Sequence, residues 1–349
     1  MKPTPIPELK YWTHGQLKYL ENCPYCQTEI SKIKYSRKDD DATWTDIWHL
    51  YQCHKCSSIY LNPRPDMDSL PKAYKNYYTH TNVKNNKELF DNSIKTHLIN
   101  GYLNSRFLMK RKNALPIGFF LFKYFAPLRN KLDNYGRNIP RILCNPNTKL
   151  LDIGFGNGDF LLRAQEMRVE PFGIENDPVS VKNINRFNIN THLGELSSAN
   201  YPKNYFDYIT LNHVIEHVEN PQELLQEIYG ILKYDGTIWL SLPNPNALGL
   251  KVFKQGWKGF HPPFHLFIPS QKSLKTMLEN SGFIDIKLVS QGLQSKGLWH
   301  ESKKISTQED ISLVNIWAHL TFLLSNILSC FTSKYAEETI ITAKRSKDN

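Results

Sequence analysis

Three glycines at alternate positions, directly after a short apolar run, constrain the fold of this chain more than any other feature. Residues 150–153 form the apolar run, the glycines are Gly154, Gly156 and Gly158, and an amphipathic run begins at Asp159. This pattern predicts a buried strand, a tight turn and the start of a helix, because glycine adopts turn conformations that a Cβ disfavours. The free backbone N–H groups and the positive end of the helix dipole then face a ligand.

A second predicted strand ends in an acid at a spacing that fits nucleotide binding. Residues 171–175 form this strand, and Glu175 lies 21 residues after Gly154. In α/β nucleotide folds a carboxylate at this distance holds the ribose hydroxyl groups. The glycine spacing is G-x-G-x-G, which differs from the G-x-G-x-x-G of dinucleotide binders. The two segments predict an open α/β sheet that binds a nucleoside at the carboxyl ends of its strands.

Four segments resemble motifs of the class I methyltransferases that use S-adenosylmethionine. Residues 152–158 resemble the first motif of that family, residues 205–212 its fourth strand, and residues 232–244 its "L-K-P-G-G" turn and fifth strand. The segment H-V-I-E-H-V at residues 213–218 resembles the ubiquinone-type O-methyltransferase branch of the family. The resemblance implies a Rossmann-like α/β sheet of seven strands and the cofactor S-adenosylmethionine.

The resemblance covers about residues 148–290, with a last strand near 338–345, and it assigns roles around the cofactor. The first-strand acid orients the glycine loop and the methionine amino end, and the second-strand acid holds the ribose. The residues after the third strand lie near the adenine, and the residue ending the fourth strand faces the methionine. The expected cofactor-binding residues are Asp152, Gly154, Gly156, Gly158, Glu175, Glu195, Leu196 and Asn212.

The candidate catalytic residues are His213, Glu216, His217 and His265. The first three are spaced three and four apart, which places them on one face if the segment turns helically. His213 is the predicted base because an imidazole titrates near neutral pH. The matching positions in the ubiquinone-type branch read Glu, Glu and His or Asp and bind a divalent metal, and His213 departs from that pattern. The alternative is structural: Glu216 and His217 brace the next helix, and His265 is a hydrogen-bonded core residue.

Four of the six cysteines form two C-x-x-C pairs with 26 residues between them. The pairs are Cys23 with Cys26 and Cys53 with Cys56. Two such pairs suit a closed structural zinc site of four thiolates, with disulfides or free thiols as the alternative. His54 lies inside the second pair and is a competing ligand. The following L-N-P-R-P at residues 61–65 resembles the N-terminal zinc ribbon of bacterial methyltransferases of polysaccharide and sugar pathways.

The charge of the chain is concentrated in its first part. The formal net charge is +10; residues 1–149 carry 24 Lys and Arg against 12 Asp and Glu, and residues 150–349 carry 19 against 21. This asymmetry indicates an anionic partner, such as a membrane surface, a nucleic acid or a phosphorylated substrate. We divide the chain into a zinc ribbon (1–65), a basic helical linker (66–147) and a methyltransferase domain (148–349) with an amphipathic helical insert at about 300–335.

Two apolar segments are too short or too interrupted to cross a bilayer. Residues 117–125, with cationic flanks, suit either an interfacial helix or a helix packed on the catalytic domain. Residues 311–331 contain polar residues at intervals, which favours an amphipathic helix that covers the pocket. The N-terminus lacks the apolar core of a signal peptide. We therefore expect a cytoplasmic protein with peripheral contact at the inner face of the membrane.

The expected reaction is O-methylation of a sugar or of a lipid-linked glycan intermediate. Two other functions are compatible with the sequence: an RNA or other nucleic-acid methyltransferase, and a non-catalytic module that binds S-adenosylmethionine. Nucleic acid is disfavoured as a partner because the basic segment is rich in Phe and lacks an RNA-binding signature. The D/N-P-P-Y/F motif of base-amino methylation is also missing from the sequence. The methylated atom and the oligomeric state stay open.

Overall fold

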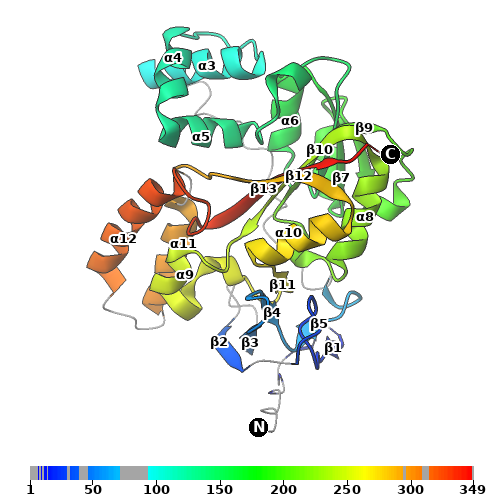
Figure 1. The fold of residues 1–349 in the computed structure, drawn as a ribbon, viewed down its shortest axis with the longest axis vertical. Coiled ribbons are helices and arrows are strands. Elements are labelled where there is room, and N and C mark those ends of the chain that lie inside the picture. Colours follow the sequence, from blue (N-terminus) through cyan, green and yellow to red (C-terminus); the bar gives the residue numbers. More distant parts are fainter. Residues whose placement is uncertain are drawn as a thin grey trace.

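The computed structural model describes residues 12–13, 15–29, 32–38, 46–70, 93–293, 296–308 and 314–347, together with Pro7 and Leu9. Residues 71–92 of the predicted linker and 309–313 of the predicted insert lie outside the described residues. Figure 1 shows a central sheet with helices on both sides, a group of helices at one end and a small set of strands at the other.

The central sheet has seven strands. In spatial order they are β12 (Phe283–Val289), β13 (Glu338–Arg345), β10 (Leu232–Pro243), β9 (Phe206–Asn212), β6 (Lys149–Ile153), β7 (Glu170–Glu175) and β8 (Asn190–Leu193). The five strands from β10 to β8 are parallel, and β13 runs against both of its neighbours. The predicted Rossmann-like α/β fold is confirmed. At the place of the predicted turn before the fifth strand, β10 already runs from Leu232. Its pairing with β9 shifts register there, between Leu232 and Thr237.

Helices cover both faces of this sheet because successive side chains of its strands point to opposite sides. Leu151 of β6 packs in the core that includes Leu225 of α8 (Pro221–Ile231) and Leu274 of α10 (Gln271–Asn280). Leu150 packs on the other face, in a core with Phe107 at the end of α3 (Ile94–Phe107). That second core also receives side chains from α4 (Ile117–Tyr124) and α5 (Ala126–Tyr135). The described helices of the predicted linker therefore share one core with this face of the sheet.

The N-terminal strands form a separate antiparallel sheet that the C-terminal half of the chain completes. Its order is β11 (Phe267–Ile268), β4 (Ile59–Leu61), β3 (Ile47–Gln52) and β2 (Ile33–Lys38). β1 (Leu17–Lys18) and β5 (Arg64–Pro65) pair in a second, two-stranded antiparallel sheet. We use the word ribbon below for the described part of residues 1–65. Phe267 pairs with Tyr60, and Cys23, Cys53 and Tyr60 belong to the same core as the residues under α8 and α10. The ribbon is thus anchored to the large sheet through both backbone pairing and core packing.

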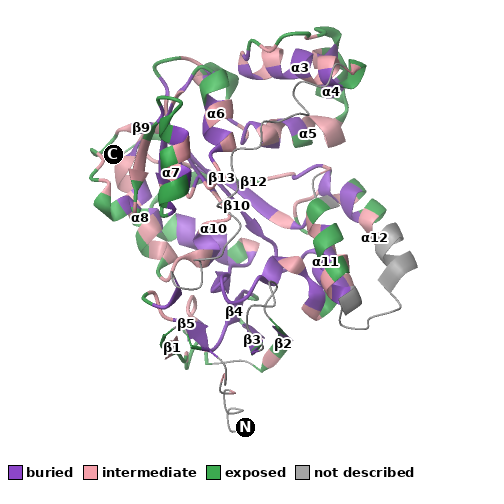
Figure 2. Cartoon of the chain, turned by 180° about the vertical axis from the view of Figure 1, so that it is seen from behind, coloured by how far each residue is buried: buried purple, intermediate pink, exposed green. Residues whose placement is uncertain are grey.

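The last layer consists of helices and 3₁₀ turns that follow β10 in the chain. They are α9 (Leu248–Phe253), α11 (Lys296–Gln308) and α12 (Val314–Ser329), with the 3₁₀ turns η6 (Lys254–Gly256) and η7 (Lys258–Phe260). Trp257 and Phe260 are fully buried in a core with Trp48 of the ribbon and Phe253. Figure 2 shows the buried residues along the large sheet and the ribbon, with exposed residues on the outer helices.

No helix within the described ranges combines the length and the apolar character that crossing a bilayer requires.

Candidate active site

A cleft of about 2580 Å³ opens at the carboxyl ends of β6, β7 and β9. Small-molecule pockets commonly measure about 300–1,000 Å³, so this cleft has room for two ligands side by side. One wall is the loop between β6 and α6 (Asp159–Glu166) with the ends of the neighbouring strands. The opposite wall comes from the ribbon, from residues 213–219 and from residues 258–265. Ribbon residues on that wall include Lys18, Asn22, Gln27 and Arg64, and Asp68 lies just after the ribbon.

The three glycines of the loop have distinct spatial roles. All three have left-handed backbones, with φ of 66° at Gly154, 57° at Gly156 and 83° at Gly158. A Cβ on Gly154 would lie 2.5 Å from Cγ2 of Val214, and one on Gly158 would lie 2.0 Å from Cδ1 of Ile184. A Cβ on Gly156 would meet no atom within 4 Å. Gly156 therefore presents an open backbone face to the cleft, whereas the other two glycines allow close packing.

Glu175, at the end of β7, lies beside this open face. Its Oε2 accepts a hydrogen bond from the Gly156 N–H at 2.7 Å, and its Oε1 accepts from the N–H groups of Asn176 and Asp177 at 2.8 and 3.3 Å. Burial raises the pKa of Glu175, and the three N–H donors oppose that rise. The carboxylate is thus held in a fixed position on the wall of the cleft.

Three further predicted residues lie on the same wall. Glu195 and Leu196 line the cleft after β8, at the start of the 3₁₀ turn η4 (Leu196–Ser198), and Asn212 lines it at the end of β9. The Gly194 N–H bonds to the Glu175 carbonyl at 3.0 Å, which joins this turn to the end of β7. The structure therefore brings together the predicted residues on the β7, β8 and β9 ends.

Asp152 is the exception, because it is fully buried and does not line the cleft. Its carboxylate accepts hydrogen bonds from the Arg137 guanidinium and, at 2.8 Å, from the Thr210 hydroxyl. Burial raises the pKa of Asp152, and the Arg137 charge opposes that rise. Arg137 lines the cleft, and its guanidinium lies 3.8 Å from the Phe160 ring centroid. The predicted contact of Asp152 with the glycine loop is absent in this arrangement; the acid instead anchors an arginine that the sequence did not single out.

His213 has both ring nitrogens occupied by carboxylates. Nδ1 lies 3.0 Å from Oε1 of Glu216, and Nε2 lies 2.9 Å from Oε1 of Glu338 on β13. Burial lowers the pKa of His213, but the two carboxylates outweigh this effect and raise it well above 6.5. An imidazolium that donates both protons to neighbouring acids has no nitrogen left to accept one. This geometry argues against the predicted role of His213 as the base.

His217 and His265 present neutral imidazoles to the cleft instead. His217, which ends the 3₁₀ turn η5 (Ile215–His217), donates from Nδ1 to the Phe264 carbonyl at 3.0 Å. His265 donates from Nδ1 to the Gly259 carbonyl at 2.8 Å, and its ring centroid lies 4.7 Å from that of His217. Burial lowers the pKa of His217 and places that of His265 well below 6.5. Each ring therefore keeps Nε2 as an acceptor nitrogen near neutral pH.

These two histidines and Glu216 form a cluster of possible metal ligands. Ligand atoms of Glu216, His217 and His265 all lie within 4.8 Å of one another. Glu216 is fully buried, and its Oε2 has no hydrogen-bond partner among the described residues. Imidazole and carboxylate are donors suited to divalent transition metals. His213 is outside this set because its nitrogens face Glu216 and Glu338.

Sequence reasoning missed His261 as a residue of the cleft. It is buried, lines the cleft, and has its ring centroid 5.3 Å from that of His265. Burial lowers its pKa well below 6.5. The signal was present in the H-P-P-F-H segment, where two histidines flank a proline pair. The sequence did not reveal that both histidines would face the cleft.

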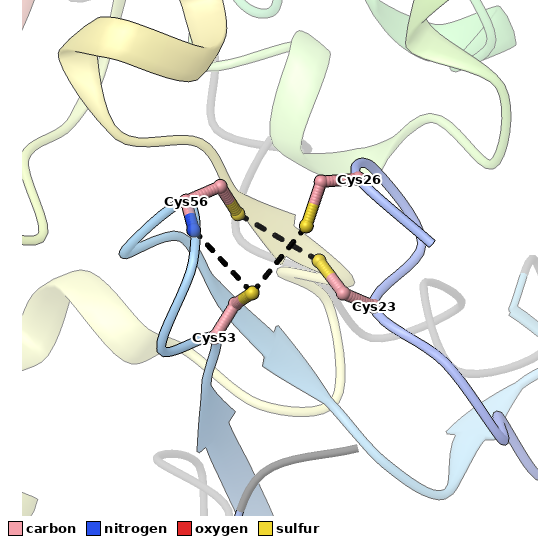
Figure 3. Close-up of side chains that lie close together, drawn as sticks. All are labelled: Cys23, Cys26, Cys53 and Cys56. Atoms are coloured by element: carbon pink, nitrogen blue, oxygen red, sulfur yellow. Dashed lines mark hydrogen bonds between the residues drawn. The ribbon is translucent and has the colours of Figure 1, made fainter. Parts of the chain in front are cut away.

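The four predicted metal-binding cysteines converge (Figure 3). Sγ of Cys23 lies 3.7 Å from that of Cys56, and Sγ of Cys26 lies 3.5 Å from that of Cys53. A tetrahedral site with Zn–S bonds of about 2.3 Å requires sulfur atoms about 3.8 Å apart. All four are free thiols, which rules out the disulfide alternative in this structure. His54 is exposed and outside the cluster.

The two cysteine pairs have the same local backbone. The Gln27 N–H bonds to the Cys23 carbonyl at 3.1 Å, and the Ser57 N–H bonds to the Cys53 carbonyl at 2.9 Å. Gln27 and Ser57 occupy equivalent positions and both have left-handed φ, at 54° and 60°. Each pair therefore forms the same tight turn, with its two thiols on the same side.

Comparison with known proteins agrees with the topology. Residues 125–288 match the sequence model of a family described as a methyltransferase domain. The matched residues make up slightly less than half of the chain. The match begins in α5 and includes the glycine loop, Glu175 and the histidines of the cleft, but not the ribbon.

Solved structures similar to the chain include three methyltransferases. A SAM-dependent methyltransferase from Archaeoglobus fulgidus is 21% identical, with a TM-score of 0.42, over 65% of this chain and 99% of that chain. Phosphoethanolamine N-methyltransferase 2 from Haemonchus contortus, in complex with S-adenosyl-L-methionine, is 16% identical, with a TM-score of 0.44, over 71% and 60%. A possible histamine N-methyltransferase from Thermotoga maritima is 13% identical, with a TM-score of 0.41, over 72% and 99%. No curated protein matches the chain.

Proposed function

We propose that the protein transfers the methyl group of S-adenosylmethionine to a hydroxyl group of a sugar or of a lipid-linked glycan intermediate. The observation that carries the proposal is the pairing of two unlike walls in one cleft. One wall offers a glycine loop and a fixed carboxylate, and the other offers buried imidazoles and polar ribbon residues. The first suits the cofactor and the second suits a hydroxylated acceptor.

The residues of the first wall fit the cofactor. The open face of Gly156 admits a ligand against the backbone, and Glu175 supplies two acceptor oxygens for a ribose diol. Leu196 offers an apolar surface for an adenine ring, and Asn212 offers an amide near the methionine end. When bound, S-adenosylmethionine supplies an electrophilic methyl group on its sulfonium. The protein's task is then to aim the acceptor oxygen and to remove its proton.

We assign the proton acceptor to His217. Its Nδ1 proton is held by the Phe264 carbonyl, so Nε2 is the basic nitrogen, and burial keeps the ring neutral. His213 acts as a positioning residue: its two carboxylate contacts link η5, which carries Glu216 and His217, to β13. The proposed base, His217, therefore lies four residues after His213, the base expected from the sequence.

The ribbon supplies the polar surface for the acceptor. Nζ of Lys18 lies 2.6 Å from Oε1 of Glu219, and Nη2 of Arg64 lies 3.4 Å from the same oxygen. Glu219 follows η5, so these contacts fasten the ribbon to the segment that carries the proposed base. Side chains with amide, carboxylate and cationic groups match the hydroxyl groups of a sugar.

We infer that the four cysteines hold a structural zinc ion. With four thiolate ligands such a site has no open position for chemistry, so its role is to fix the ribbon. The ribbon is fixed in turn to α10, because the Ser270 hydroxyl donates to the Cys56 carbonyl at 2.7 Å. Purified protein is expected to contain about one zinc per chain, and the Cys53→Ser/Cys56→Ser variant none. Cys144→Ser, outside the cluster, is the control and keeps the metal; a wild-type protein that folds without zinc contradicts the inference.

The reaction is tested with full-length protein and methyl-labelled S-adenosylmethionine. Three acceptor preparations are compared: a lipid-linked glycan extract, nucleotide sugars and total RNA. Label is expected in a glycan or sugar fraction and not in RNA, and Gly156→Arg, which blocks the cofactor wall, gives none. Label in RNA would support the nucleic-acid alternative. Cofactor binding without label in any fraction would support the non-catalytic alternative and overturn the proposal.

A further inference from the structure

We propose that the outer face of α4, together with the end of α12, is a docking surface for an anionic lipid bilayer. Ile117, Phe120, Leu121 and Tyr124 follow one another at helical spacings of three, one and three. Their exposed fractions are 58%, 61%, 51% and 77%. One face of this helix therefore places four large apolar side chains in water, which is a mark of a contact surface.

The opposite face of α4 is firmly packed, so the exposed face has a fixed direction. Phe119 stacks on Tyr102 of α3 with ring centroids 5.9 Å apart, and Phe122 meets the same ring edge-on at 6.0 Å. A Cβ on Gly118 would lie 2.0 Å from the Leu98 carbonyl oxygen, so the two helices are in backbone contact. The apolar outer face is consequently not needed for folding onto α3.

The charge around this face selects the partner. Residues 93–132 contain eight Lys and Arg and no Asp or Glu. Two of these cations are internal, because Arg106 pairs with Asp133 and Arg111 pairs with Glu166. The exposed cations of this segment are Lys95, Lys110, Lys112, Lys123 and Lys131. Exposed apolar and aromatic side chains among lysines match an interface of anionic headgroups over acyl chains, which attracts cations and accepts apolar groups.

The end of α12 extends the surface. Leu323, Leu324 and Ile327 are exposed on this helix, and Phe331 is exposed directly after it. The Asn130 side chain of α5 donates to the Cys330 carbonyl at 3.4 Å, which ties this end of α12 to the helix that follows α4. In both Figure 1 and Figure 2, α4, α5 and α12 lie toward the same side of the molecule. Two short apolar faces on one side suit binding parallel to a membrane surface.

The test is co-sedimentation of the full-length protein with lipid vesicles. Vesicles that contain phosphatidylglycerol are compared with vesicles of phosphatidylcholine alone. Partition onto the anionic vesicles is expected to be at least about tenfold stronger, and to weaken as salt screens the lysines. The Phe120→Ser/Leu121→Ser/Tyr124→Ser variant is expected to lose at least about tenfold in partition.

A matched control replaces three exposed apolar residues elsewhere. Phe187 lies just after α7 (Pro178–Asn185), and Ile284 and Leu288 lie on β12; all three are exposed. The Phe187→Ser/Ile284→Ser/Leu288→Ser variant should bind vesicles like the wild type. Lys110→Gln/Lys112→Gln/Lys123→Gln removes three exposed positive charges, and it should lose the preference for anionic lipid while keeping its fold. Binding of S-adenosylmethionine by each variant reports on the folded state.

Three outcomes overturn the proposal. The first is equal partition of the wild type onto anionic and neutral vesicles. The second is wild-type partition by the serine variant of α4. The third is a dimer in sedimentation velocity that this variant abolishes while its vesicle binding is unchanged, which would assign the face to a second copy of the chain. Vesicle binding requires no acceptor, so these outcomes are separate from the fate of the methyl-transfer proposal.

Discussion

The two walls of the cleft are built in opposite ways. On the first wall, the decisive contact joins the Gly156 N–H to Glu175, only 19 positions apart in the chain. On the second wall, Lys18 reaches Glu219 across 201 positions, and His213 reaches Glu338 across 125. The first wall is a product of local backbone conformation, and the second is a product of long-range assembly.

This difference separates two kinds of chemistry. Backbone N–H groups and glycines recognise features common to one cofactor, and they need only a strand, a turn and a helix to be presented. Buried histidines acquire their protonation states from neighbours and from burial, as the contrast between His213 and His217 illustrates. Under the proposed function the cofactor wall is therefore general, and the specificity for the acceptor resides in the second wall.

The largest effect is expected from blocking the first wall. Gly156→Arg places a long side chain on the one open face of the loop, so the affinity for S-adenosylmethionine should fall at least about 1000-fold. Isothermal titration calorimetry measures the change. Gly230→Arg, on α8, is a matched control because a Cβ there also meets no atom within 4 Å. Unchanged binding by the Gly156 variant would refute the pocket.

On the second wall, His217→Gln should slow methyl transfer to the labelled acceptor by about 100-fold without weakening cofactor binding. Burial lowers the pKa of His217 below 6.5, so the wild-type rate should hold as pH falls to that value and decline only below it. The variant should lack this decline. His213→Gln is the comparison, and a larger rate loss there than at His217 would return the role of base to His213.

The His213 contacts should be visible in stability. Because the folded pKa of His213 is raised above 6.5, its two contacts stabilise the protein fully below that pH, and this contribution disappears as pH rises through the raised pKa. His213→Gln should therefore lower the free energy of unfolding by about 2 kcal/mol in mildly acidic buffer and by less in alkaline buffer. Urea denaturation measures it, with the exposed His300→Gln as control. An equal loss at both pH values would exclude an ionic contribution.

The smallest effect concerns the fixed carboxylate of the first wall. Glu175→Gln retains one acceptor oxygen and replaces the other with an amide donor, so cofactor affinity should fall about tenfold. Glu170→Gln, at the other end of β7 where Glu170 pairs with Lys149, should bind like the wild type. If the two variants bind equally well, the ribose contact lies elsewhere.

Sequence patterns were sufficient for the large sheet and for much of the first wall. The apolar run before the glycines, the glycine spacing and the acid after the second strand are local signals, and they predicted β6, β7 and the β6–α6 loop; β9 and β10 were expected from the resemblance to methyltransferase motifs. The C-x-x-C pairs likewise carry their own turn geometry, which brings each pair of thiols to one side. The same reasoning could not find Arg137. A buried acid such as Asp152 requires a hydrogen-bonding partner, but its position in the sequence does not indicate which residue that partner is.

The sequence by itself determined the backbone elements and the cofactor loop, since both depend on residues within a few turns of one another. The tertiary structure decided which histidine is neutral and which acid is buried. It also decided that β11, which begins 208 positions after the start of β4, completes the ribbon sheet. Protonation and pairing depend on the charges and the burial that distant segments impose, and those are set only when the chain has folded.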